Sequence, residues 1–313
     1  MLLQDARDYQ ILFLSLFLIL GLGTRDWTVR PEFLAVTIAT CLATQWLMSE
    51  LQERWQSWRE QQIQSDDIGL PTTPSPDQTV PAGQQGRSLR SALITALGLC
   101  LLLRADHMST VVLAGSLAIL SKFVLRIQGK HFFNPANFGI IAVLVLTHDA
   151  WVSPGQWGDE GWYGLLFLGA GGLVLQRVGR WDTSVAFLST YAGLEAYRNW
   201  WLGWTWDVYW HRLMSGSLLL FALFMITDPR SIPNARSGRL VWSMSIAGLT
   251  FVLRNQFFLP TAVFWALFAL APATLLIDLL WSAPRFAWLT QPAATASNEA
   301  ASSSAVKVQE RYS

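Results

Sequence analysis

The chain has 313 residues, of which 52% are hydrophobic and only 14% are charged. Since a soluble domain carries roughly a quarter charged residues, this composition excludes an ordinary soluble enzyme. The formal charge of +1 provides no basic field that would hold nucleic acid. Cys41 and Cys100 stand in separate apolar runs, which excludes a disulfide framework and a self-contained iron–sulfur site.

Ten apolar runs predict an all-α fold, a polytopic membrane helical bundle of about ten transmembrane segments. The runs cover residues 9–23, 33–48, 89–103, 108–124, 132–146, 162–175, 183–196, 210–226, 240–253 and 257–280. Several are shorter than the roughly 20 residues that cross a bilayer, so we expect some spans to be tilted or broken. Ten spans also suit two inverted repeats of five helices.

The distribution of positive charge predicts the orientation. Of the 22 lysines and arginines, 16 fall at the two termini and in the even-numbered connections, and six fall in the odd-numbered connections. Because retained positive charge marks the cytoplasmic side, we expect both termini in the cytoplasm. This predicts an integral protein of a bacterial-type inner membrane.

The domain prediction has four sections. Residues 1–48 hold two spans, 49–88 hold an interfacial helix and a flexible cytoplasmic linker, 89–280 form an eight-segment membrane core, and 281–313 form a disordered cytoplasmic tail. The interfacial helix is predicted because Leu51, Trp55 and Trp58 share one helical face. A solvated helix end explains that pattern equally well.

The first polar stretch, residues 126–139, contains Gly129-Lys130 and then Asn134-Pro135-Ala136-Asn137. Asn134 is predicted to cap a helix, because proline is favoured in the first helical turn. The free amides of that turn, together with Lys130, provide a site for an anionic or carbonyl-bearing group. A capped helix entry without a ligand is the equally weighted alternative.

Two further stretches, residues 225–239 and 177–184, lie on the same predicted side and make one composite site geometrically possible. Thr227 and Asp228 stand at the edge of an apolar run, where a carboxylate needs a partner or a role. The second stretch carries three arginines, which also serve as topology anchors, and for Arg239 we favour that interpretation. In the third stretch Asp182, Thr183 or Ser184 is expected to be an N-cap and nothing more.

The opposite side carries a tryptophan-rich segment, residues 197–210, which predicts an interfacial aromatic belt. A site where a quinone stacks on these rings is a weaker alternative. Glu195 and Asp278 are candidate intramembrane carboxylates for ion movement, although both lie near the ends of runs.

The Gly-Lys-x-Phe-x-Asn-Pro-Ala stretch and the Met-x-Thr-Asp-Pro stretch at residues 225–229 together resemble a known family. Its members are typified by the D subunit of the Rnf electron transport complex and the B subunit of the sodium-translocating NADH:quinone reductase. The resemblance extends over residues 90–280. It implies a non-autonomous membrane subunit that carries electrons through bound flavin and couples this to sodium or proton transport. The implied partners are other membrane and flavin-bearing subunits, a quinone and a flavin transferase.

The resemblance implies FMN or riboflavin as the cofactor, with cofactor-binding residues drawn from the three stretches: Lys130, Asn134, Asn137, Thr183, Thr227, Asp228 and Arg230. In the family, FMN is attached to a threonine in a Gly-Glu-Thr-Ser-like stretch. The local counterpart is Trp181-Asp182-Thr183-Ser184, which departs from that pattern and weakens the case for covalent attachment at Thr183.

Two other functions remain open. A channel or solute transporter is suggested by Asn134-Pro135-Ala136 and the permuted Pro233-Asn234-Ala235, which are similar to the paired loops of aquaporins. Ten runs exceed the six spans of that fold, and the loops face one side. A cofactorless structural subunit is the third possibility.

Overall fold

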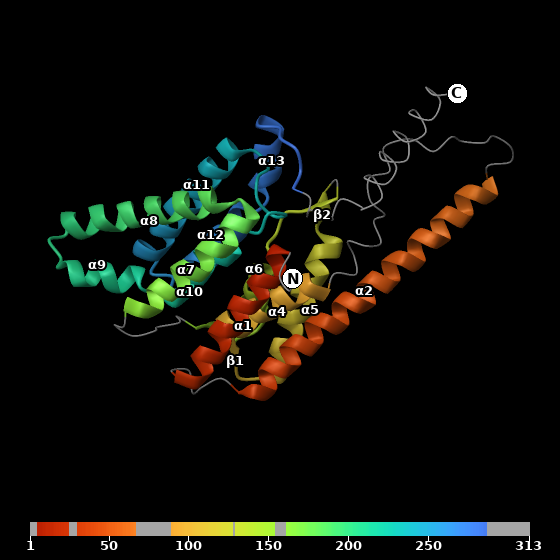
Figure 1. Ribbon diagram of the computed structural model, residues 1–313, viewed down its shortest axis with the longest axis horizontal. Helices are drawn as coiled ribbons and strands as arrows, with labels where there is room; N and C mark the ends of the chain where they lie inside the picture. Colours follow the sequence, from red (N-terminus) through yellow and green to blue (C-terminus); the bar gives the residue numbers. More distant parts are fainter. Residues whose placement is uncertain (1–4, 25–29, 67–88, 128, 154–160, 287–313) are drawn as a thin grey trace, which may run out of the picture. The chain divides into compact units, whose positions relative to one another are not determined.

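The computed structural model describes residues 5–24, 30–66, 89–127, 129–153 and 161–286 (Figure 1). Its helices are α1 (Ala6–Thr24), α2 (Pro31–Asp66), α4 (Leu89–Leu102), α5 (Met108–Val124), α6 (Pro135–Leu146), α7 (Gly161–Val178), α8 (Trp181–Trp201), α9 (Trp206–Leu213), α10 (Gly216–Leu220), the π-helix η1 (Phe221–Met225), α11 (Arg236–Asn255), α12 (Ala262–Leu270) and α13 (Ala273–Leu280). Two small antiparallel sheets pair β1 (Leu103–Ala105) with β4 (Ala150–Val152) and β2 (Arg126–Ile127) with β3 (Lys130–His131).

Each of the ten predicted apolar runs contains helix, and the prediction of a mainly helical fold is confirmed. By length and composition, α1 and the Pro31–Arg59 part of α2 can each cross a membrane. The pair α12–α13, bent by 51°, adds a third span if it is counted as one. Ten spans and inverted repeats therefore stay predictions.

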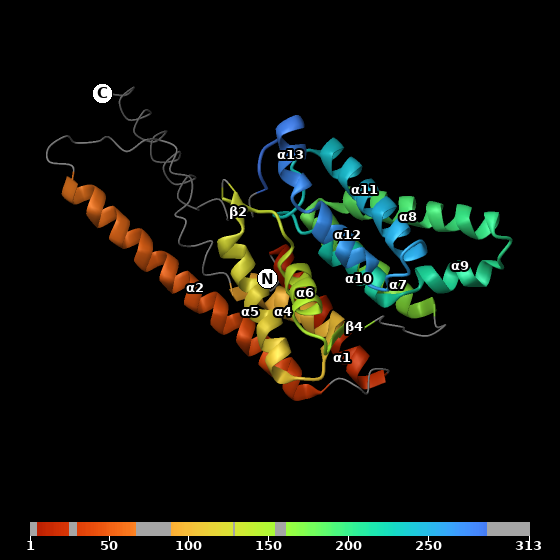
Figure 2. The same cartoon turned by 180° about the vertical axis from the view of Figure 1, so that it is seen from behind.

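The N-terminal helices pack around α4 and α5. Helix α5 lies between α2 and α6, and α1 runs along α4, as both views show (Figures 1 and 2). Gly139 allows α6 to approach α5 closely, because an added Cβ would lie 2.6 Å from the carbonyl oxygen of Ala114. Phe17 of α1 stacks on Phe167 of α7 with 4.1 Å between ring centroids, which joins this group to the following helices.

The C-terminal helices centre on the pair α8 and α11, and α12 packs against α11. The predicted run 210–226 is not one helix, because α9 ends at Leu213 and α10 begins at Gly216. Helix α10 continues into η1, where the amide of Ile226 donates to the oxygen of Phe221 at 2.9 Å. All five residues of η1 are buried.

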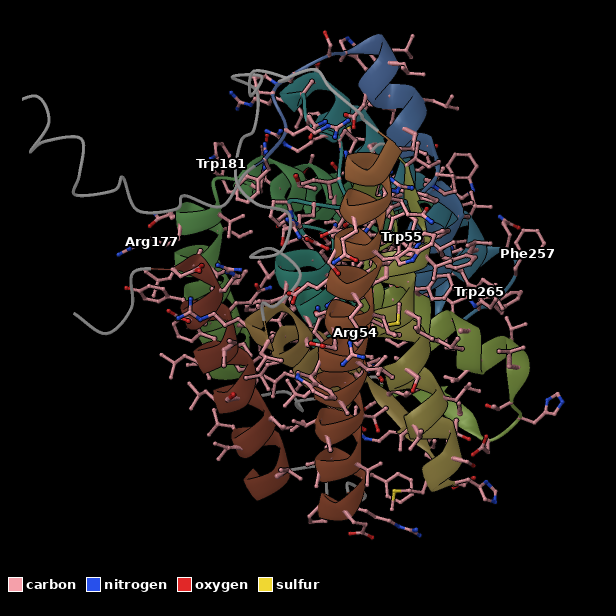
Figure 3. The ribbon with its side chains drawn as sticks, turned by 90° about the vertical axis from the view of Figure 1, so that its right-hand side faces the viewer. Arg54, Trp55, Arg177, Trp181, Phe257 and Trp265 are labelled. Carbon is pink, nitrogen blue, oxygen red and sulfur yellow. The ribbon has the colours of Figure 1, made fainter. Side chains whose placement is uncertain are left out.

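Helix α2 continues without a break from Pro31 to Asp66, so the helix predicted over residues 49–64 is its C-terminal part. Arg54 and Trp55 lie on this part (Figure 3), and Trp55 is 52% exposed. Of the predicted helix-and-linker section 49–88, residues 67–88 lie outside the described residues, as do residues 287–313 of the predicted tail 281–313. A second unit, residues 284–313, is described only over residues 284–286, which form neither helix nor strand.

Candidate functional site

The first two polar stretches meet at a polar junction, which we define by Lys130, His131, Asn134, Asp228 and Asp278. Asn134 is the N-cap of α6: its side chain accepts a hydrogen bond from the amide of Asn137 at 3.0 Å, which confirms the predicted cap. Its Nδ2 also donates to the oxygen of Met225, the last residue of η1, at 3.1 Å. One side chain thus joins the start of α6 to the end of η1.

Lys130 extends the junction to the last helix. Its Nζ donates to the carbonyl oxygen of Ile232 and to Oδ2 of Asp278, each at 2.6 Å. The other carboxylate oxygen of Asp278 accepts from the amide of Asn234 at 2.7 Å. Because the side chains of Lys130 and Asp278 are only 8% and 18% exposed, little solvent screens this ion pair.

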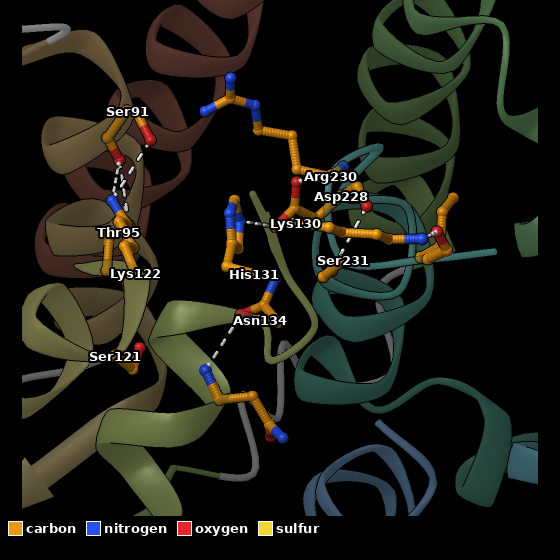
Figure 4. Close-up of polar contacts among 12 residues, drawn as sticks. Ser91, Thr95, Ser121, Lys122, Lys130, His131, Asn134, Asp228, Arg230 and Ser231 are labelled. Carbon is orange, nitrogen blue, oxygen red and sulfur yellow. Dashed lines mark hydrogen bonds and ion pairs between the residues drawn. The ribbon is translucent and has the colours of Figure 1, made fainter. Parts of the chain in front are cut away.

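His131 and Asp228 form the third contact between the stretches, with Nε2 and Oδ2 3.8 Å apart (Figure 4). Burial alone would raise the pKa of Asp228, but His131 and Arg230 lower it below its ordinary value. Burial lowers the pKa of His131, and Asp228 opposes that change only in part. Each group thus shifts the pKa of the other in the direction that favours an ion pair, and burial opposes this at both.

Two other predicted residues lie inside the helical packing. The hydroxyl of Thr227 donates to the oxygen of Leu223 at 2.9 Å. The side-chain Nδ2 of Asn137 donates to the backbone oxygen of Phe264 at 3.1 Å. Asn137 Oδ1 has no hydrogen-bond partner within the part of the chain that the structure describes, and the residue is 1% exposed.

The third stretch joins the second through a buried ion pair. Asp182 lies 2.7 Å from Arg239 at the start of α11, and their side chains are 5% and 6% exposed. The prediction of an N-cap at Asp182, Thr183 or Ser184 is wrong, because the N-cap of α8 is Arg180. Ser184 instead donates to the oxygen of Ala222 at 2.5 Å. Arg239 is buried and paired, which the sequence pattern did not indicate.

A flavin joined covalently to Thr183 does not fit this arrangement. Thr183 is 0% exposed in the first turn of α8, and its hydroxyl lies 3.5 Å from Oδ1 of Asp182. A phosphodiester at this hydroxyl needs room for the flavin and access for the transferring enzyme. The folded chain offers neither at Thr183.

On the predicted opposite side, Glu195 is held in a separate network. Its carboxylate accepts from Arg212 at 2.9 Å and from Asn255 at 2.8 Å, and it is 2% exposed. In the tryptophan-rich segment, Trp200 and Trp201 are 67% and 70% exposed. Exposed indole rings of this kind suit a membrane interface.

Residues 150–286 match the model of the NQR2, RnfD, RnfE family. The chain resembles that family. This confirms the resemblance drawn from the two motifs, although the first of them precedes the matched segment. Polar contacts nevertheless bind the first stretch to the second, which lies inside the matched segment.

Individual relatives share one name, the D subunit of an ion-translocating oxidoreductase complex. The protein so named in Stutzerimonas stutzeri is 35% identical over 119 residues, 36% of this chain and 32% of the relative. That of Tolumonas auensis is 36% identical over 96 residues, 30% of this chain and 27% of the relative. That of Pseudomonas paraeruginosa is 28% identical over 265 residues, 64% of this chain and 73% of the relative. The first two matches thus span about a third of the relatives' length.

Proposed function

We propose that the chain is a membrane subunit of an ion-translocating oxidoreductase complex. The match over residues 150–286 and the name of the relatives support this assignment. The observation that carries it is the polar junction, in which both family motifs meet between helix ends. An isolated helix cap would not require these long-range contacts.

The proposal includes ten spans with both termini in the cytoplasm, and transport of sodium ions or protons. Coupling requires an element with two states that the redox reaction can bias. The bent pair α12–α13 suits this role, because Asp278 of α13 is bonded to Lys130 and Asn234. Rupture of these bonds would release α13 from the junction.

For the cofactor, we propose that flavin-bearing partner subunits supply the FMN or riboflavin and that no flavin transferase acts on this chain. Thr183 is buried, and the polar groups of Lys130, Asn134 and Thr227 are already bonded within the chain. In this assignment the chain positions helices and ions beside the partners' redox groups. A quinone is the proposed electron acceptor of the complex.

The test is purification of the tagged full chain in mild detergent, both from its own host and after expression alone. From the host we expect flavin-containing membrane proteins to co-purify, and we expect no flavin fluorescence on the chain's own denatured band. Fluorescence on that band that disappears in Thr183→Ala would overturn the cofactor assignment. Ion permeability of proteoliposomes that contain the chain alone, without reductant, would favour the channel alternative.

A further inference from the structure

We propose that the headgroup of an anionic phospholipid binds at a basic cluster formed by Lys122, Arg126 and Arg230. Lys122 lies in the last turn of α5, Arg126 follows in β2, and Arg230 lies in the turn after η1; Figure 4 shows Lys122 and Arg230. The proposal rests on the excess of positive charge at these three residues. It does not depend on the proposed role of the chain in an oxidoreductase complex.

Lys122 is the most deeply buried member. It is 6% exposed, and its ammonium donates to the backbone oxygen and the hydroxyl of Ser91 at 3.1 and 3.2 Å. No carboxylate within the described residues forms an ion pair with it. A buried ammonium with only neutral acceptors is costly, so an anion nearby would stabilise it.

Arg230 adds a second cation that forms no ion pair with a carboxylate of the described residues. Its backbone amide is bonded to Asp228, but its guanidinium meets no acceptor in the described ranges of the chain. Arg126 lies beside Lys122, because its Nε donates to the backbone oxygen of Lys122. Arg230 lies beside Asp228, whose carboxylate is 3.8 Å from His131. In Figure 4 His131 lies between Lys122 and Asp228, with the Arg230 side chain extending above it.

The charges in this neighbourhood do not cancel. Lys122, Arg126 and Arg230 are cations, whereas Asp228 is the carboxylate that acts on Lys122 and Arg230, and it already contacts His131. Guanidinium and ammonium groups are the side chains that recognise phosphate groups in proteins.

The surroundings favour a lipid over a free phosphate. Val124 and Ile127, which flank Arg126 in the chain, are 69% and 47% exposed. A headgroup on the cations would allow its acyl chains to lie over these apolar side chains. Basic pockets between transmembrane helices on the cytoplasmic side are known to hold anionic headgroups, and the charge distribution predicts that side here.

The experiment uses the full chain in detergent with three probes: phosphatidylglycerol, phosphatidylcholine and inorganic phosphate. Bound lipid is counted by native mass spectrometry, and the thermal unfolding midpoint is followed during titration. We expect phosphatidylglycerol to bind and to raise the midpoint. Arg230→Gln should weaken that binding roughly fivefold, the effect of one basic residue near an anionic surface.

Arg236→Gln is the matched control, because Arg236 comes from the same connection, is 68% exposed and lies 3.7 Å from Asp182. Its affinity for phosphatidylglycerol should equal that of the wild type. Arg230→Gln should fold even if a Lys122→Gln variant does not, since the Arg230 guanidinium bonds no described residue. The proposed site would be wrong if phosphatidylcholine bound as tightly as phosphatidylglycerol, or if both arginine variants lost the same affinity for phosphatidylglycerol. If inorganic phosphate alone raised the unfolding midpoint, the ligand would not be a lipid.

Discussion

Lys130 and Asp278 are separated by 148 positions in the sequence, yet their charged atoms lie 2.6 Å apart. Removal of one partner leaves a largely buried charge without its counter-ion, which commonly costs about 3 kcal/mol or more. We therefore expect Lys130→Met to lower the free energy of unfolding by about 3 kcal/mol. The double variant with Asp278→Asn should lose less than the sum of the two single variants. Denaturant unfolding of the detergent-solubilised chain measures all three.

Arg54→Met provides the control for this double-mutant cycle of Lys130 and Asp278. Arg54 pairs with Glu50 at 3.0 Å on α2, but its side chain is 76% exposed. Such exposed pairs contribute about 0.5 kcal/mol at most, so the variant should unfold like the wild type. Additive losses in the Lys130 and Asp278 cycle would show that the pair does not stabilise the fold.

For single residues, the helix cap at Asn134 was predictable, whereas the N-cap of α8 at Arg180 and the long-range pairs were not. The cap at Asn134 followed from the Asn-Pro sequence, because capping involves only residues of the same turn. The pairing of Asp182 with Arg239 connects positions 57 apart, and no spacing rule indicates it. From the sequence, the basic connection around Arg239 therefore indicates a topology anchor and not a buried ion pair.

Among the elements, the entry of α6 combines two interactions in one side chain. Asn134→Ala removes both the cap and the bond to Met225, and we expect a loss of about 2 kcal/mol in the free energy of unfolding. Asn134→Asp keeps the capping oxygen but replaces the Nδ2 donor by a charged oxygen that faces the oxygen of Met225, so it should unfold at a lower midpoint than the wild type. Equal midpoints for Asn134→Asp and the wild type in thermal unfolding would rule out a contribution from the Met225 bond.

The contact between α5 and α6 depends on a missing side chain. In Gly139→Ala the new Cβ would lie 2.6 Å from the backbone oxygen of Ala114 and 2.8 Å from Cβ of Ala118, so the helices must separate. We expect a loss of about 1–3 kcal/mol, as for an overpacked core. Gly193→Ala, at a position in α8 with nothing within 4 Å, should instead gain up to about 1 kcal/mol from helix propensity. Thermal unfolding of both variants would test this, and a neutral Gly139→Ala would contradict the close approach.

The positions of the elements were predictable from apolar runs, but their breaks were not. The run 257–280 contains Pro272, and the structure separates α12 from α13 there. Proline has no backbone N–H and breaks helices, so Pro272 indicated this break. A search for apolar runs misses it, because the run stays hydrophobic across the proline. In helix α2 the apolar run ends but the helix does not. Polar residues follow position 49, and the helix continues to Asp66.

For the chain as a whole, the predicted orientation places residue 236 in the cytoplasm and residue 206 on the opposite side. Cys41 and Cys100 are buried, so the wild type should not react with a membrane-impermeant maleimide. Arg236→Cys and Trp206→Cys replace side chains that are 68% and 54% exposed. Intact cells should label only Trp206→Cys, and inverted vesicles only Arg236→Cys. Labelling of both from one side would contradict the ten-span topology.

The π-helix η1 lets its segment tolerate a change in length. A π-turn is closed by a hydrogen bond from residue i+5 to residue i, so it holds one residue more than an α-turn. Removal of one residue from Phe221–Met225 would therefore restore α-helical geometry and leave the Thr227-Asp228-Pro229 turn at nearly the same place around the helix axis. Asp228 would keep its direction toward His131. A related chain can thus be one residue shorter just before this motif and still make the contact.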